Sequence, residues 1–348
     1  MSLPELLAEA RELGASDLHL TRNSPPIVRI NGVLEPLQMP PLTTEDTMKM
    51  IYNILNDVQR IKFEENWELD CSLDIAGIGR FRVNVHRQRA SIEAAFRLVN
   101  DSVLTLEQLG LPEVIGDFGR FENGLVMITG PTGSGKTTTM AALVDQINNE
   151  RHSMIITIED PIEYTHRNKS CIIKQREVSS DTKSFSVALR HALRQDPDVI
   201  CVGEMRDLET ISTALTAAET GHLVLATIHT PDVAQTIDRI IDVFPPHQQQ
   251  QIRYQLAATL QGIVAQLLVP TADELERIPA CEILVGTLAV RKLIRSQTTE
   301  QITTLIQTSF DLGMITMDKS LKTLYESGAI EYEMAISKCR YPEMFDHI

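Results

Sequence analysis

The first hundred residues alternate short apolar segments with turns, a pattern typical of a small mixed domain. Leu3 to Leu13 places its apolar residues on one helical face, and Asn31-Gly32 is a strong hairpin signal. Thr43 or Thr44 is placed to cap a second helix, which we expect to run to about residue 59. The pattern therefore predicts an α+β domain over residues 1–100. The segments expected to be strands are 17–20, 27–30, 81–85 and 91–99.

From Gly124 onward the expected strands no longer alternate apolar and polar residues. They are apolar at nearly every position, and helical stretches separate them. Strands of this kind are typical of a parallel sheet covered by helices on both faces. We therefore predict an α/β domain over residues 122–348, largely helical from about Pro245, with the less regular segment 101–121 as a linker or hinge. The expected strands are 125–129, 154–158, 199–202 and 223–228.

Composition and charge narrow the class of protein. The chain has 348 residues, of which 43% are hydrophobic and 23% charged, and this is typical of a globular protein of about two domains. The formal net charge of −15 disfavours general nucleic-acid binding, so no nucleic-acid partner is expected. Five dispersed cysteines without a C-x-x-C pair indicate neither a zinc site nor a disulfide framework. Without a signal-peptide pattern or a long apolar window, a cytoplasmic location is expected.

The strongest chemical signal is a glycine-rich segment that matches G-x-x-x-x-G-K-[ST]. It follows an expected strand and opens an expected helix, which is the context that a phosphate-binding P-loop requires. Its backbone N–H groups and the helix N-terminus would hold phosphates, Lys136 would reach the β and γ phosphates of ATP, and Thr137 would hold Mg²⁺. The expected nucleotide-binding residues here are Gly130, Pro131, Thr132, Gly133, Ser134, Gly135, Lys136, Thr137 and Thr138.

Acidic and histidine residues follow or flank the neighbouring expected strands. Glu163 lies shortly after the strand that ends at Ile158, and Glu204 follows the strand that ends at Val202, at the edge where parallel sheets bind ligands. One carboxylate could orient the attacking water, and another could support the metal. His222 and His229 bracket the strand 223–228 and are too far apart to share a metal ion. His229 could sense the γ phosphate, although the local pattern is equally compatible with a structural histidine.

Four motifs in order resemble the secretion-superfamily ATPases. They are GPTGSGKT from residue 130, TIEDPIEY from 157, LRQDPDVICVGEMRD from 193 and ETGHLVLATIHT from 219, which correspond to the Walker A motif, Asp box, Walker B segment and His box of that family. GASDLHL from 14, PPIVRINGVLEPL from 25 and GRFRVN from 79 resemble the N-terminal domain of its twitching-motility retraction ATPases. The resemblance runs over nearly the whole chain.

The resemblance implies a PAS-like domain followed by a RecA-like P-loop ATPase domain, assembled as a homohexamer. It also implies an ATPase at the inner-membrane base of a type IV pilus, acting through a platform protein and only indirectly on the pilin fibre. By position, Glu163 closes the Asp box, Glu204 is the Walker B glutamate, which we also place at the metal, and His222 and His229 are the His-box pair. The arginines that would complete the site from a neighbouring subunit match Arg82 and Arg97, with Arg194 and Arg239 as further candidates.

Two departures from the retraction-ATPase pattern bear on the alternatives. The family's AIRNLIRE reads AVRKLIRS from residue 289, and basic residues follow GRFRVN in VHRQR from residue 85. Neither departure changes a predicted phosphate-binding residue, so the prediction of ATPase activity is independent of them. Pilus-assembly and type II secretion ATPases usually have a longer N-terminal region and a four-cysteine insert, which this sequence does not show. An accessory paralogue with weak hydrolysis and a RecA-like nucleic-acid translocase remain as alternatives.

Overall fold

The computed structural model describes residues 2–99 and 102–345, and they divide into two compact units. Unit 1 comprises residues up to 102 together with 161–165, and unit 2 comprises 103–160 and 166 onward. Residues 100 and 101, where the predicted first domain ends and the predicted linker begins, lie outside the described residues.

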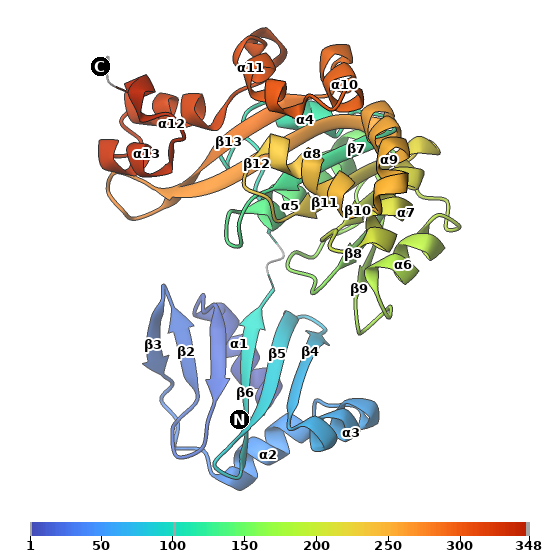
Figure 1. Ribbon diagram of the computed structural model, residues 1–348. Coiled ribbons are helices and arrows are strands. Elements are labelled where there is room, and N and C mark those ends of the chain that lie inside the picture. Colours follow the sequence, from blue (N-terminus) through green and yellow to red (C-terminus); the bar gives the residue numbers. More distant parts are fainter. Residues whose placement is uncertain (1, 100–101, 346–348) are drawn as a thin grey trace. The chain divides into compact units, whose positions relative to one another are not determined.

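Unit 1 is a six-stranded antiparallel sheet of order β3-β2-β1-β6-β5-β4, with three helices (Figure 1). Its elements are α1 (Leu3–Glu12), β1 (Asp17–Leu20), β2 (Ile27–Ile30), β3 (Val33–Pro36), α2 (Thr44–Tyr52), α3 (Asp57–Asn66), β4 (Glu68–Ile75), β5 (Gly79–Gln88) and β6 (Ser91–Leu98). Asn31 and Gly32 have φ values of 48° and 83°, which a hairpin turn of this kind needs, so β2 and β3 pair where the sequence predicts.

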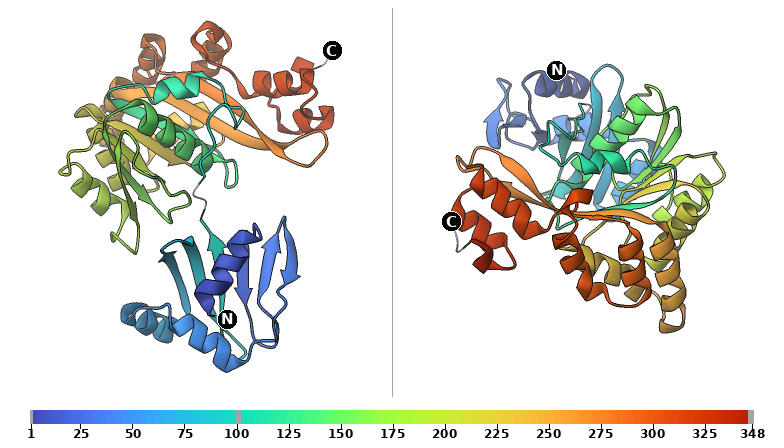
Figure 2. Two further views of the ribbon diagram at one scale, coloured as in Figure 1. Left: turned by 180° about the vertical axis from the view of Figure 1, so that it is seen from behind. Right: turned by 90° about the horizontal axis from the view of Figure 1, so that it is seen from above.

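One face of the unit 1 sheet is buried beneath the helices, as the view from behind in Figure 2 shows for α1. Leu6 of α1, Ile51 of α2 and Phe63 of α3 pack with the apolar residues of the strands in one core. The predicted second helix is wrong in its extent, since α2 ends at Tyr52. Asn56 accepts a hydrogen bond from the backbone N–H of Gln59 and begins α3 as a separate helix.

The predicted linker also differs from the structure, because residues from Val103 onward belong to unit 2. Leu106, Leu111 and Ile115 are buried in the unit 2 core, and Phe118 of α4 (Val114–Phe118) packs so closely on Gly262 that a side chain there would clash with its ring. These apolar residues are spaced irregularly, and that irregularity suggests a linker in the sequence although they are core residues.

Unit 2 is built on a seven-stranded sheet of order β13-β12-β7-β11-β10-β8-β9, in which all pairs except β12–β13 are parallel. The strands are β7 (Gly124–Thr129), β8 (Met154–Glu159), β9 (Ile172–Glu177), β10 (Val199–Val202), β11 (Leu223–Ile228), β12 (Leu260–Pro270) and β13 (Arg277–Val285). The α/β fold with a mostly parallel sheet is therefore confirmed.

Helices cover both faces of this sheet. The view from above in Figure 2 shows α5 on one side of the orange strands β12 and β13. Residues of α4 and α5 form one buried layer, and those of α6 to α11 contribute to the other. Further helices are α5 (Lys136–Glu150), α6 (Phe185–Ala192), α7 (Leu208–Glu219), α8 (Val233–Asp242), α9 (Pro246–Thr259), α10 (Leu288–Arg295), α11 (Ile302–Gln307), α12 (Met317–Glu326) and α13 (Tyr332–Lys338). None of the helices in the described ranges combines the length and apolar character that a bilayer crossing demands.

The prediction of a largely helical C-terminal part is wrong for residues 260–285. β12 and β13 form an antiparallel pair there, and β12 also extends the parallel sheet beside β7. A mostly apolar run such as Leu260 to Pro270 does not by its spacing distinguish a buried strand from a buried helix. The error matters for the site, because β12 lies next to the strand that leads into the P-loop.

Candidate nucleotide-binding site

The phosphate-binding loop connects the end of β7 to the start of α5. Gly133 and Gly135 have φ values of 79° and 86°, in the left-handed region that favours glycine, so the loop depends on glycine at these two positions. The 15-residue helix α5 begins at Lys136 and directs its N-terminal N–H groups at the loop. Successive N–H groups in such a turn, added to the helix dipole, form a concavity suited to a phosphate.

Lys136 is the first residue of α5, and its side chain turns back onto the carbonyls of the loop. It is buried, with 7% of its surface exposed. Its Nζ donates to the carbonyl oxygens of Gly130 and Pro131, at 2.8 and 2.9 Å. Nζ also lies 3.4 Å from Nδ1 of His229. Pro131, Thr132 and Gly133 are exposed, whereas Ser134 is buried, and Thr137 and Thr138 are half-buried. The loop thus holds a buried ammonium behind an exposed rim.

Gln266 of β12 is not among the site residues predicted from the sequence, but its side chain supports the loop by hydrogen bonds. Its Nε2 donates to the carbonyl oxygen of Ser134 at 2.8 Å, and its Oε1 accepts from the hydroxyl of Thr139 at 2.8 Å. Gly130 and Gly135 both approach Gln266 so closely that a Cβ on either would clash with it. A buried polar residue in an apolar run is the signal that could have identified it.

Glu204 is brought to the loop by strand register. Val202 of β10 pairs with Ala226 of β11, and Thr129 of β7 pairs with Ile228 of β11, so Glu204 and Gly130 follow the two strands that flank β11, at the same edge of the sheet. Thr227 holds the turn after β10: its hydroxyl donates to the Gly203 carbonyl, and its carbonyl accepts from the Met205 N–H. The carboxylate of Glu204 is therefore fixed beside the P-loop, as predicted.

The side chains of Arg206 and His229 both contact the carboxylate of Glu204. Nε of Arg206 lies 2.5 Å from Oε1 of Glu204, and Nε2 of His229 lies 3.2 Å from the same oxygen. Partial burial raises the pKa of Glu204, but Arg206 and His229 outweigh it, and the pKa is lowered overall. Glu204 is thus held as a carboxylate, the form that can accept a proton.

The two histidines lie at opposite ends of β11. His229 follows Ile228 and contacts both Lys136 and Glu204. His222 precedes Leu223, and its Nδ1 lies 3.0 Å from the carbonyl oxygen of Ala217. A six-residue strand separates the histidines by about 20 Å, so the structure does not bring His222 to the P-loop of its own chain.

Glu163 is exposed and belongs to the segment 161–165, which is grouped with unit 1. It is therefore not among the side chains that unit 2 gathers at the P-loop. Within unit 2, the carboxylate at the end of β8 is Glu159, which accepts hydrogen bonds from the hydroxyl of Thr157 and from Nε2 of Gln175.

The four candidate arginines are exposed and lie on different elements. Arg82 of β5 and Arg97 of β6 are directly paired across the unit 1 sheet, and Nε of Arg97 lies 2.9 Å from Oδ1 of Asp17. Both belong to the face of the sheet opposite the helices. Arg194 precedes β10, whereas the P-loop lies at the carboxyl ends of the strands, and Arg239 is on α8.

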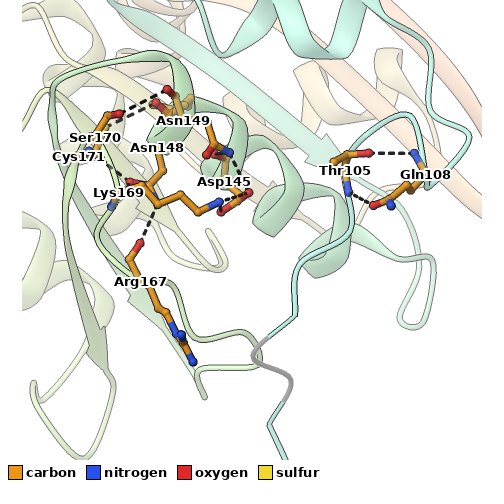
Figure 3. A network of polar contacts seen from close by, with 10 residues as sticks. Thr105, Gln108, Asp145, Asn148, Asn149, Arg167, Lys169, Ser170 and Cys171 are labelled. Atoms are coloured by element: carbon orange, nitrogen blue, oxygen red, sulfur yellow. Dashed lines mark hydrogen bonds and ion pairs between the residues drawn. The ribbon is translucent and has the colours of Figure 1, made fainter.

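A buried asparagine ties α5 to the segment that leads from the Asp box into β9. Asn148 donates from Nδ2 to the carbonyl oxygen of Arg167, and its Oδ1 accepts from the N–H groups of Lys169 and Cys171, at 2.8 to 3.2 Å (Figure 3). Nζ of Lys169 pairs with the carboxylate of Asp145 one turn earlier on α5. Three hydrogen bonds and one ion pair therefore join the P-loop helix to residues 167–171.

The described residues contain no group of three or more His, Cys, Asp and Glu side chains arranged to hold a metal ion by themselves. A magnesium ion bound with a nucleotide does not need such a group, because phosphate and water oxygens supply most of its ligands. Thr137 at the start of α5 and the ionised Glu204 offer the hard oxygen donors that this ion prefers. These residues fit a nucleotide-bound Mg²⁺.

Comparison with known proteins agrees with this site and fold. Residues 2–308 match the family model described as type II/IV secretion system protein. The chain is 48% identical to the type IV pilus retraction ATPase PilT of Pseudomonas aeruginosa, covering 99% of this chain and all of the relative. It is 41% identical to the type IV pilus ATPase PilU of the same organism, covering 97% of this chain and 88% of the relative.

Among solved structures, the crystal structure of the pilus retraction motor PilT with bound ADP matches with a TM-score of 0.93 and 47% identity, covering 100% of both chains. The Legionella pneumophila ATPase DotB matches with a TM-score of 0.77 and 28% identity, covering 96% of this chain and 94% of that one. The resemblance drawn from four sequence motifs is confirmed. The chain belongs to the type II/IV secretion system protein family.

Proposed function

We propose that this protein is an ATP-hydrolysing motor that drives the retraction of type IV pili. The observation that carries the proposal is the contact of His229 with both Lys136 of the P-loop and Glu204 of β10. Similarity over the whole length to a protein named as a retraction ATPase supports the pilus role.

The P-loop from Gly130 to Thr138 would hold the phosphates of ATP, and Thr137 and Glu204 would hold the magnesium ion. When bound, the ion neutralises charge that develops on the phosphate oxygens. Lys136 would exchange its contacts with the loop carbonyls for the β and γ phosphates, which also lie within the reach of an ammonium at this position.

Glu204 and His229 would act on the attacking water. Glu204 is held ionised, so its oxygen can accept a hydrogen bond from water and orient it toward the γ phosphate. His229 is hydrogen-bonded to that carboxylate and would sense whether the γ phosphate is present. Glu163 remains the proposed second carboxylate from the Asp box.

Arg82 and Arg97 would complete the site from a neighbouring subunit of a homohexamer. A guanidinium stabilises the charge of the transferring phosphoryl group only when it is close, so hydrolysis would depend on the position of the neighbour. His222 and Arg194 precede β11 and β10, at the edge of the sheet opposite the P-loop, and Arg239 is exposed on α8. These three side chains would also act across a subunit boundary. The hexamer would work on a platform protein at the cytoplasmic side of the pilus base.

An accessory role beside a principal retraction motor is the second candidate. It is favoured by the similarity to the type IV pilus ATPase PilU, which is nearly as extensive as the similarity to PilT. An accessory subunit would turn over ATP slowly when alone. The presence of Lys136 and of the ionised Glu204 favours the motor.

The pilus role is tested in a piliated strain whose own retraction ATPase gene is deleted. Expression of the wild-type chain should restore retraction of fluorescently labelled pili, and Lys136→Ala should not. Failure of a well-expressed wild type to restore retraction, together with restoration when a second motor is supplied, would assign the accessory role instead. Light scattering of the purified protein with ADP should give the mass of six chains.

A further inference from the structure

Three buried threonine side chains link the P-loop strand to the loop that carries His229. Thr129 is the last residue of β7, Thr230 directly follows His229, and Thr236 lies in the first turns of α8. Oγ1 of Thr230 lies 2.6 Å from Oγ1 of Thr129 and 2.6 Å from Oγ1 of Thr236. The exposed fractions of Thr129 and Thr236 are 0%, and that of Thr230 is 8%.

The three hydroxyl protons can be placed so that each hydroxyl donates once. Thr230 donates to Thr129, and Thr129 donates to the carbonyl oxygen of Thr230 at 2.5 Å. The one proton of the Thr236 hydroxyl is shared between Oγ1 of Thr230 and the carbonyl oxygen of Asp232, which lies 2.7 Å away. The N–H of Thr230 also donates to Oγ1 of Thr129, at 3.1 Å. Thr129 and Thr230 are therefore joined by three hydrogen bonds, all of which use the single hydroxyl of Thr129.

This linkage begins where the backbone pairing of the sheet ends. Thr129 and Ile228 are the last pair between β7 and β11, so beyond them no strand pairing fixes His229 relative to Gly130. Beyond this pair, hydrogen bonds to the hydroxyl of Thr129 hold the loop that carries His229 against β7. The contact between Thr230 and Thr236 holds the same loop against α8. Val233, at the start of α8, is in turn held by its N–H, which donates to the buried carboxylate of Glu282 on β13.

We propose that Thr129, Thr230 and Thr236 are positioning residues of the ATPase site, which hold the imidazole of His229 between Lys136 and Glu204. The proposal rests on the proposed ATPase function. Catalytic contacts tolerate little displacement, and an error of about 1 Å in a catalytic group can cost about 10²-fold in rate. The three hydroxyls bond to one another and to backbone groups of Thr230 and Asp232, so they should affect turnover more than nucleotide binding.

The test compares Thr129→Val with Thr129→Ser in the full-length protein. Valine has the shape of threonine without its hydroxyl, whereas serine keeps the hydroxyl. Thr259→Val is the matched control, because Thr259 is also buried in unit 2 but its hydroxyl donates only within α9, to the Gln255 carbonyl. Steady-state ATP hydrolysis with Mg²⁺, equilibrium binding of fluorescent ADP and hydrogen exchange of a peptide containing the Thr230 amide are measured for each variant.

The expected result for Thr129→Val is a fall in kcat of about tenfold or more, with KM for ATP and ADP affinity within about twofold of wild type. The Thr230 amide should exchange faster, because it has lost its acceptor. Thr129→Ser and Thr259→Val should behave like wild type in all three measurements. If Thr129→Val does not fold, Thr236→Val replaces it. This variant removes the contact with Thr230 and the hydrogen bond to the Asp232 carbonyl but keeps the bonds between Thr129 and Thr230, so a smaller fall in kcat is expected.

A kcat of Thr129→Val equal to that of wild type overturns the positioning role. A fall in kcat as large in Thr129→Ser as in Thr129→Val overturns it as well. A parallel loss of ADP binding would mean that the hydroxyl supports the whole loop and would also overturn it. These results differ from a failure of the proposed function, in which the wild-type protein itself hydrolyses no ATP.

Discussion

Nε2 of His229 lies 3.2 Å from Oε1 of Glu204, and this contact is one of the two that assign the hydrogen-bonding roles of the ring nitrogens. The other ring nitrogen, Nδ1, faces Nζ of Lys136, and an ammonium can only donate. Nδ1 therefore accepts, and Nε2 carries the proton that is donated to Glu204. One imidazole thus connects the ammonium of the P-loop with the carboxylate that is proposed to act on water.

Arg206 should set the acid limit of activity. Its guanidinium contacts Glu204 and lowers the pKa of that carboxyl, against the effect of burial. In Arg206→Ala the pKa of Glu204 should rise, so the acid limb of the pH–rate profile should move to higher pH, while turnover at about pH 8 changes less. The exposed Arg190, which pairs with Glu209 elsewhere on the surface, provides the control Arg190→Ala. An acid limb that stays in place in Arg206→Ala would contradict this role.

The unit 1 arginines should matter for turnover and little for folding. Arg82 is exposed, and the Arg97 side chain is 67% exposed although it pairs with Asp17. Arg82→Ala and Arg97→Ala should each lower kcat about 10²-fold or more if they stabilise the transition state in a neighbouring subunit. Arg29→Ala, in the next strand pair along the same sheet face, should leave kcat unchanged. Wild-type turnover in both Arg82→Ala and Arg97→Ala would exclude the cross-subunit role.

Asn148 should contribute strongly to stability. Asn148→Ala would leave the buried N–H of Cys171, the part-buried N–H of Lys169 and the carbonyl of Arg167 without the partner seen in Figure 3, at a cost of about 3 kcal/mol in the free energy of unfolding. The adjacent Asn149 is exposed, and Asn149→Ala should change that free energy by less than about 0.5 kcal/mol. Urea unfolding followed by circular dichroism measures both. Similar values for the two variants would show that the network has little net effect.

The P-loop and the strands around it could be predicted from sequence because their signals are local. Glycine at 133 and 135 is required by the backbone, and a fully apolar run such as Leu223 to Ile228 is typical of a buried parallel strand. The position of Glu204 followed as well, because the carboxyl ends of parallel strands meet at one edge.

The contacts inside the site could not be predicted, because they depend on register and on strand order. The proximity of His229 to Lys136 requires β7 and β11 to be neighbours with Thr129 paired to Ile228. Gln266 was missed because its segment carries the apolar pattern of a helix as readily as that of a strand. The separation of the two histidines, by contrast, follows from the predicted strand 223–228 that they bracket.

Glu204 is proposed to act on water at a nucleotide held by the P-loop, and Glu204→Gln removes the carboxylate that this role requires. Gln keeps the size of the side chain and removes its charge, so ADP binding should persist. Steady-state ATP hydrolysis with Mg²⁺ should fall about 10²-fold or more, whereas the control Glu219→Gln, at an exposed position of α7, should hydrolyse ATP like wild type. Wild-type hydrolysis by Glu204→Gln would contradict the account.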